Sequence, residues 1–188
     1  MITRRSLVAA LALSITLPAL ASAQMPERYR AIAINMSNIA PGTNTTVDFV
    51  IERWSSDAEE DRLVEAFQKG PEALLKALQA VKPRVGYIQV TGQTGWDIRY
   101  ADKTKGEDGG WRIVVLTDRP IGFREAASRS RTMDYPFTLV EFHVNDDGIG
   151  EGRASVYTKI TWDEKTRTLH LENFSSEPVR LTEVRKVE

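Results

Sequence analysis

Hydrophobic and polar residues alternate with a period of two along most of this chain, which is the pattern of half-buried β-strands. In segment 46–54, for example, Val47, Phe49 and Ile51 alternate with polar positions such as Asp48. Similar β-branched and aromatic runs continue to the C-terminus, separated by Gly, Pro, Asn and Asp residues that favour turns. The pattern predicts nine strands, at 29–36, 46–54, 85–91, 96–101, 111–117, 137–145, 153–162, 168–174 and 179–187.

One segment, at about 56–82, has helical periodicity instead. Ser56 and Glu59 have the spacing of a capping box, and apolar residues then recur every three or four positions up to Gly70. Pro71 begins a second stretch with leucines on one face. We therefore expect a hairpin of two amphipathic helices, placed over an open end or edge of the strands.

The last seven predicted strands are joined mostly by short polar turns, which favours antiparallel pairing of neighbours in the sequence. We predict a mainly β fold, either an antiparallel β-barrel or a strongly curved sandwich of about nine strands, with the inserted two-helix hairpin.

The first 23 residues have the pattern of a signal peptide. Arg4 and Arg5 precede an apolar run, and Ala21 and Ala23 flank Ser22 before Gln24. We expect cleavage after Ala23 and a single domain over 24–188, periplasmic or secreted. The apolar run is too short to span a bilayer, and no later segment approaches spanning length. The paired arginines fit twin-arginine export and the general route equally well.

The amino-acid composition excludes several kinds of chemical site and argues against one class of partner. Among 188 residues there is no Cys, which excludes disulfides, thiolate metal sites and a cysteine nucleophile. The whole chain has 25 Lys and Arg against 26 Asp and Glu, and the leader contains two of the basic residues and no acid. The remaining chain is mildly acidic, so we expect no nucleic-acid partner.

Two histidines, His143 and His170, are each two residues from a glutamate on the same strand face, Glu141 and Glu172. If their strands flank one intervening strand, the two pairs are roughly 10 Å apart. Polar side chains on the wet face of a sheet explain them better than zinc ligands do. We predict neither metal nor cofactor.

The acidic, glycine-rich segment 145–152 lacks the ligand spacing of a calcium-binding EF-hand loop. We interpret Asp147 and Gly148 as a tight turn. Gly150 and Gly152, on one strand face, would allow close packing or a β-bulge.

The long connection after Thr117 is rich in arginine, with Arg119 and Arg124 near its start and Arg129 and Arg131 further on. Long ordered loops are often functional. These guanidinium groups could clamp an anion, with Asp118 orienting Arg119. The alternative is a solvated loop or a short surface helix.

Large aromatic rings at strand ends can plug the mouth of a barrel or line a pocket. We hypothesise an exported, non-catalytic module that binds an apolar or amphipathic anionic small molecule through Arg119, Arg124, Trp96 and Trp111.

Two other classes remain open. One is a hydrolase using Asp118, Glu141 or His143, although the sequence contains neither a Gly-x-Ser-x-Gly elbow nor a phosphate-binding loop. The other is an envelope module that contacts a partner protein through an exposed strand edge or the basic loop.

Four segments, at 96–101, 117–120, 135–138 and 148–152, occur in an order that resembles a group of exported bacterial proteins of unknown function. The resemblance covers about 28–186. It implies a bacterial, extracytoplasmic, β-rich domain, and it implies no activity and no functional residue.

Overall fold

The structure is a computed structural model that describes residues 25–34, 44–93, 95–106, 109–119, 136–163, 168–173 and 178–187. The predicted leader, 1–23, lies outside them. In chain order the elements are β1 (Glu27–Ile34), β2 (Asn44–Ile51), α1 (Asp57–Gln68), α2 (Pro71–Ala80), β3 (Gly86–Val90), β4 (Trp96–Lys105), β5 (Trp111–Thr117), β6 (Phe137–Val144), β7 (Ile149–Asp163), β8 (Thr168–Asn173) and β9 (Val179–Val187).

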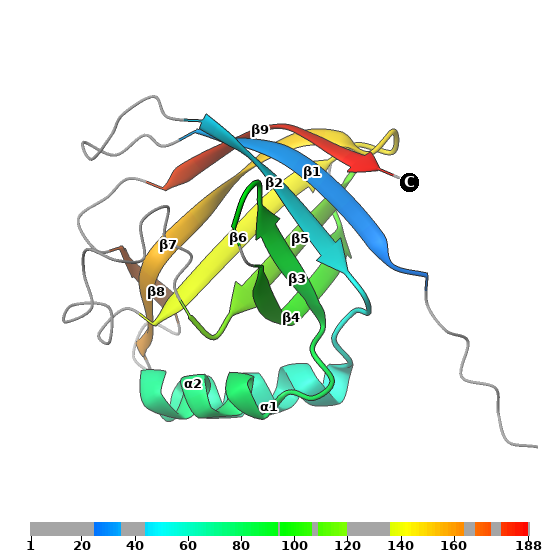
Figure 1. Cartoon of the computed structure of the whole chain (residues 1–188). Helices are drawn as coiled ribbons and strands as arrows, with labels where there is room; N and C mark the ends of the chain where they lie inside the picture. Colours follow the sequence, from blue (N-terminus) through cyan, green and yellow to red (C-terminus); the bar gives the residue numbers. More distant parts are fainter. Residues whose placement is uncertain are drawn as a thin grey trace, which may run out of the picture.

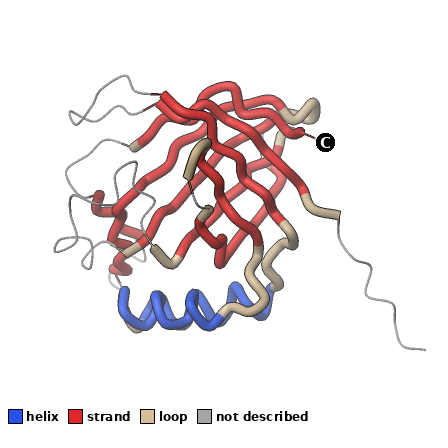
Figure 2. The backbone as a smooth tube through the Cα atoms, in the orientation of Figure 1, coloured by secondary structure: helices blue, strands red, loops and turns tan. Residues whose placement is uncertain are grey.

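The strands form a closed antiparallel barrel (Figures 1 and 2). Their order is β6-β5-β4-β3-β2-β1-β9-β7-β8, and β6 also pairs with β7. Eight strands therefore close on themselves, with β9 between β1 and β7, while β8 pairs with the part of β7 that extends beyond the ring. The predicted mainly β fold with a helical insert is confirmed, and of its two forms the barrel is the one observed.

Strand β7 begins at Ile149, four residues before the predicted start, because its glycines belong to the strand. A Cβ atom on Gly150 or Gly152 would collide with the backbone of β6. The register between β7 and β9 also shifts between these two glycines. Close packing and a bulge, which were predicted as alternatives for this pair, are therefore both present.

The barrel interior is filled by alternate side chains from all eight strands. At its centre the rings of Tyr29 and Phe49 lie 5.1 and 5.4 Å from that of Phe142. These contacts join β1, β2 and β6 across the interior.

The helical hairpin packs on the outer wall of the barrel, which differs from the expected place over an end or edge. Leu63, Leu74 and Leu78 form a second core with outward-facing residues of the strands, namely Tyr100, Leu116, Phe137, Leu139 and Ile160. Those outward apolar positions on neighbouring strands provide the surface that the helices need. In Figures 1 and 2 the two helices lie side by side beneath the barrel.

The predicted capping box of α1 is present, with reciprocal hydrogen bonds between Ser56 and Glu59. Arg53, just after β2, donates two 2.8 Å hydrogen bonds to the same Glu59 carboxylate and a third to the carbonyl oxygen of Pro83. This arginine therefore fixes both ends of the hairpin to the barrel. Within the described residues, neither helix has the length and apolar character needed to cross a membrane.

Candidate functional site

The strand registers define two ends of the barrel, which differ in chemistry. One, named here the Trp96 end, lies where β1, β3 and β5 finish and where β2, β4 and β6 begin. The other, the Glu27 end, carries the first residues of β1, β5 and β7 and the last residues of β4, β6 and β9.

The Glu27 end is closed by a charged network. The Glu27 carboxylate accepts hydrogen bonds from the Tyr29 hydroxyl at 2.6 Å and the Lys103 ammonium at 3.1 Å, and it pairs with Lys186 at 2.8 Å. These groups come from β1, β4 and β9, so the network bridges strands that are not all neighbours. The Lys103 ammonium also lies 5.6 and 4.7 Å from the ring centroids of Trp54 and Trp111.

Protonation in this network is firmly set. Burial alone would raise the pKa of Glu27, but hydrogen bonds from Lys186, Tyr29 and Lys103 lower it to about 2. Burial and the hydrogen bond to Glu27 raise the pKa of Tyr29 far above its ordinary value. Because neither group changes charge near neutral pH, the network suits a structural plug better than a general acid or base.

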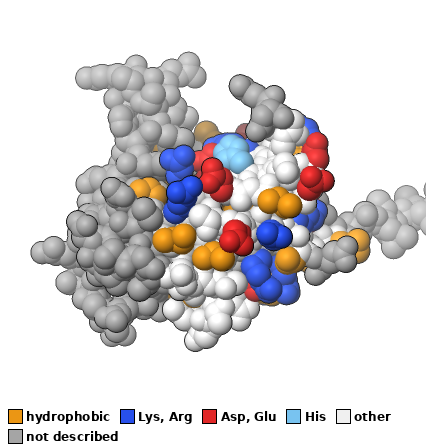
Figure 3. All heavy atoms as spheres, turned by 90° about the horizontal axis from the view of Figure 1, so that it is seen from above, with side chains coloured by type: hydrophobic (Ala, Val, Ile, Leu, Met, Phe, Trp, Pro, Cys, Tyr) orange, Lys and Arg blue, Asp and Glu red, His pale blue; other side chains and the backbone are white. Residues whose placement is uncertain are grey.

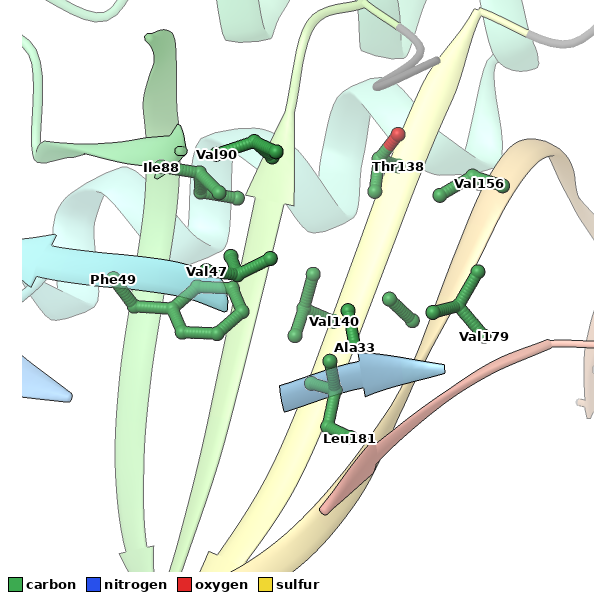
Figure 4. A pocket seen from close by; sticks show the side chains of 11 residues that line it. Ala33, Val47, Phe49, Ile88, Val90, Thr138, Val140, Val156, Val179 and Leu181 are labelled. Atoms are coloured by element: carbon green, nitrogen blue, oxygen red, sulfur yellow. The ribbon is translucent and has the colours of Figure 1, made fainter. Parts of the chain in front are cut away.

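The Trp96 end contains a small apolar hollow inside the barrel (Figure 4). Its volume is about 30 Å³. A cavity volume of about 10–15 Å³ is enough for one water molecule, so the hollow has room for about two water-sized groups. Eleven of the described residues line the hollow, and Thr138 alone among them has a polar side chain; they are Ala33, Val47, Phe49, Ile88, Val90, Thr138, Val140, Ala154, Val156, Val179 and Leu181.

Trp96 lies in the same part of the interior, opposite Ile88 in the register of β3 and β4. Trp96 is 2% exposed, and its indole N–H has no hydrogen-bond acceptor among the residues that the structure describes. The Arg119 guanidinium carbon lies 5.9 Å from the centroid of the Trp96 ring, and Arg119 donates a 3.4 Å hydrogen bond to the Gly95 carbonyl. An exposed cation and a buried, unsatisfied donor are therefore neighbours.

Of the four predicted ligand-binding residues, the structure brings together Trp96 and Arg119. Trp111, the first residue of β5, lies at the Glu27 end. The ammonium groups of Lys103 and Lys105 are 4.7 and 4.6 Å from the centroid of its ring. Arg124 lies outside the described residues.

The residues considered for hydrolysis are held in ion pairs. Asp118 accepts a 3.2 Å hydrogen bond from Arg99. On the outer face of β6, Glu141 accepts a 2.7 Å hydrogen bond from Arg112 and lies 3.2 Å from His143. Burial opposes ionisation of Glu141, yet the hydrogen bonds from Arg112 and His143 leave its pKa lowered.

The predicted distance between the two histidines is wrong. His143 pairs with Glu151 and His170 with Thr161, ten positions further along β7, which corresponds to about 33 Å of strand. The prediction placed both at one level and did not anticipate the length of β7. Across the described residues no three potential metal-ligating side chains gather.

Other outer charges are also paired, as in Arg30 with Asp48 at 2.8 Å and Arg180 with Glu151 at 3.3 Å. On the face in Figure 3, basic and acidic side chains of the described residues are interspersed.

Sequence analysis missed the Glu27 network because Glu27 precedes the predicted first strand and its partner Lys103 is 76 positions away. Lys103 also lies beyond the predicted end of its strand, at residue 101, whereas β4 continues to Lys105.

No family model, curated protein or solved structure matches the chain.

Proposed function

We propose that this protein is an exported, non-catalytic binding module that takes up an apolar or amphipathic anionic small molecule at the Trp96 end of its barrel. The observation that carries the proposal is the apolar hollow at the same end of the barrel as Trp96 and Arg119, neither of which lines it. The pattern of residues 1–23 supports a periplasmic or secreted location.

The difference in chemistry between the two ends of the barrel supports entry of a ligand at the Trp96 end. At the Glu27 end, Lys103 and Lys186 converge on one carboxylate, so a ligand would have to break a charged network to enter. At the Trp96 end the lining is almost wholly apolar. Burial of apolar surface contributes about 25 cal/mol per Å², so a hydrocarbon group gains most by entering there.

Arg119 supports an anionic head group. Its side chain is exposed and held against the Trp96 ring. A guanidinium group in that position can donate charge-assisted hydrogen bonds to a carboxylate or phosphate while the apolar part of the ligand occupies the hollow.

A non-catalytic role fits the ionisable groups that the structure describes. The pKa values of Glu27 and Glu59 are about 2, which is far from the neutral range favoured for a general base. Asp118 is bound to Arg99, whereas Glu141 and His143 lie on the outer face of β6.

Strand β8 favours a second candidate, an envelope interaction module. Among the described strands it pairs with β7 alone. Its other edge pairs with no described strand, and adding a strand from a partner protein at such an edge is a common mode of peptide recognition.

Native mass spectrometry of protein purified from its own host separates these candidates. A retained small mass supports the binding module, and a retained protein supports the second candidate. Calorimetric titration with acetate, butanoate, octanoate and dodecanoate then tests the ligand class directly.

We expect saturable binding of at least one carboxylate. Arg119→Ala, alone or with Arg124→Ala, should weaken it on the order of 10- to 100-fold per lost charged hydrogen bond. The matched control is Arg30→Ala, which removes an exposed arginine paired on the outside of the barrel. If no member of the series binds, the proposal is wrong.

A further inference from the structure

The residues at the exit of β5, Thr117, Asp118 and Arg119, are each anchored to the body of the barrel. The hydroxyl group of Thr117, which is fully buried, donates a 2.6 Å hydrogen bond to the carbonyl oxygen of Arg119. The same hydroxyl oxygen accepts a 3.3 Å hydrogen bond from the backbone N–H of Thr138. The backbone of Arg119 is therefore tied to both β5 and β6.

Asp118 is anchored through Arg99 of β4. The Arg99 guanidinium group donates a 3.2 Å hydrogen bond to the Asp118 carboxylate, and the two side chains are only 19 and 13% exposed. Arg99 also pairs with Asp97 at 3.3 Å and donates a 3.4 Å hydrogen bond to the carbonyl oxygen of Val81, which caps the end of α2. Arg99 thus joins β4, the end of the hairpin and the exit of β5.

An arginine suits this junction better than a lysine. Its planar group presents several N–H donors in fixed directions, so it can hold two carboxylates and a carbonyl oxygen at the same time. A lysine ammonium group is a single point of charge on a flexible stem. Because both Arg99 and Asp118 are mostly shielded from water, their attraction is screened less than that of a fully exposed pair.

Arg119 is the exposed residue of this segment. Its guanidinium group donates a 3.4 Å hydrogen bond to the carbonyl oxygen of Gly95, and its guanidinium carbon lies 5.9 Å from the centroid of the Trp96 ring. An exposed arginine has many rotamers, so the position of its backbone decides which of them reach that ring. Asp118 directly precedes Arg119, and its ion pair with Arg99 therefore restrains this backbone.

We infer that Arg99 is a positioning residue, which acts through Asp118 to hold the Arg119 guanidinium group against the Trp96 ring. This inference rests on the proposed binding function, in which Arg119 contacts the anionic head group, and it adds the residue that keeps this contact in place.

The first readout is the position of Arg119 itself and needs no ligand. A proton held over an aromatic ring has its NMR signal shifted upfield by the ring current. ¹H–¹⁵N spectra of the arginine Nε–H groups should show this shift for Arg119, whose signal is assigned with Arg119→Lys. Trp96→Leu should abolish the shift if the ring is its source.

Three variants then test Arg99. Arg99→Met keeps an apolar stem and removes the cation, and Asp118→Asn replaces the carboxylate by a neutral amide of the same size. In both, the Arg119 signal should move toward the value of a free arginine. Arg99→Lys restores a cation for Asp118 and should recover part of the shift. Should Arg99→Met fail to fold, Asp118→Asn alone decides the question.

Arg84→Met is the matched control. Arg84 pairs with Glu52 at 2.8 Å and, like Arg99, with Asp97, at 3.2 Å. The control therefore removes a neighbouring arginine from the same group of ion pairs and leaves the pair of Arg99 with Asp118 in place. It should leave the Arg119 signal unchanged.

The second readout is affinity for whichever carboxylate of the calorimetric series binds most tightly, compared with the alcohol of the same chain length. In Arg99→Met and Asp118→Asn the carboxylate should bind roughly three- to tenfold more weakly, as expected when neighbouring groups of one ion-pair network are coupled. Binding of the alcohol should not change, because it has no charge for Arg119 to contact.

The outcomes keep the two levels of inference apart. If the Arg119 signal stays in place in both variants, or moves as far in Arg84→Met, Arg99 does not position Arg119 and the binding function stands. Equal weakening of carboxylate and alcohol would also overturn the inference, since the variants would then act on the fold. If no carboxylate binds the wild type, the proposed function fails, while the NMR signal still decides whether Arg99 holds Arg119.

Discussion

Replacing Glu27 by Gln should destabilise the protein in a pH-dependent way. The substitution keeps the size of the side chain but removes the charge that Lys103 and Lys186 contact. The pKa of Glu27 falls from 4.5 to about 2, and one pKa unit corresponds to about 1.4 kcal/mol, so the native environment favours the carboxylate by about 3 kcal/mol. Its side chain is only 20% exposed, which limits screening by solvent.

The sign of the pH dependence follows from the lowered pKa. The stabilisation is fully present above pH 4.5, the value expected in the unfolded chain, and is lost as pH falls from there toward 2. Urea unfolding of wild type and Glu27→Gln should therefore differ by about 3 kcal/mol at pH 7, and the difference should shrink below pH 4.5 and disappear as pH approaches 2.

Glu65→Gln is the control, because Glu65 pairs with Lys69 at 2.7 Å on an exposed helix face and such pairs contribute little. Equal stability of Glu27→Gln and wild type at pH 7 would refute the reasoning. A difference that stays constant down to pH 2 would also refute it, since packing and not charge would then be responsible.

Other predictions concern packing and processing. Gly152→Ala should destabilise the barrel by about 1–3 kcal/mol in urea unfolding, because the added Cβ meets the Glu141 carbonyl oxygen of β6; an unchanged midpoint would contradict the close approach of the two strands. Leu78→Ala should cost about 2–5 kcal/mol, since this fully buried side chain joins the hairpin to the outer wall; a loss below 0.5 kcal/mol would show that the hairpin docks without it. N-terminal sequencing of the exported protein should begin at Gln24, and a retained leader would contradict cleavage after Ala23. Far-ultraviolet circular dichroism should be unaffected by a chelator; lost signal would indicate a structural metal.

The sequence predicts strands well where apolar residues are frequent and turn-forming residues mark both ends of the strand. The bounds of β5 and β9 are those predicted, because each is a run rich in β-branched and apolar residues that lies between turn residues. The start of β7 was misplaced because glycine signals both a turn and a close approach of two backbones, and only the neighbouring strand decides between them.

Tertiary placement is harder to predict from one sequence. The helical periodicity of α1 and α2 shows that they have apolar faces but does not identify the surface they cover; outward positions such as Leu116 and Leu139 decide it. Trp96 and Arg119 were both predicted as site residues, yet the sequence does not show that the Trp96 indole N–H lacks an acceptor among the described residues, because that depends on the tertiary structure. The Glu27 network could not be predicted either, because the closed barrel is what brings β1, β4 and β9 together at this end.

The position of β9 has a consequence for the order in which the protein matures. Ile32 of β1 lies beside Thr182 of β9, 150 positions later. Because β9 lies between β1 and β7, the barrel cannot close without it, and the β1 and β7 edges would then lack their β9 partner. Such edges invite pairing with other chains, and contacts so distant in sequence form slowly. A chain that is exported unfolded would have to avoid pairing with other chains through β1 and β7 until β9 has joined the sheet. A fragment that ends before Val179 lacks β9 and should therefore aggregate.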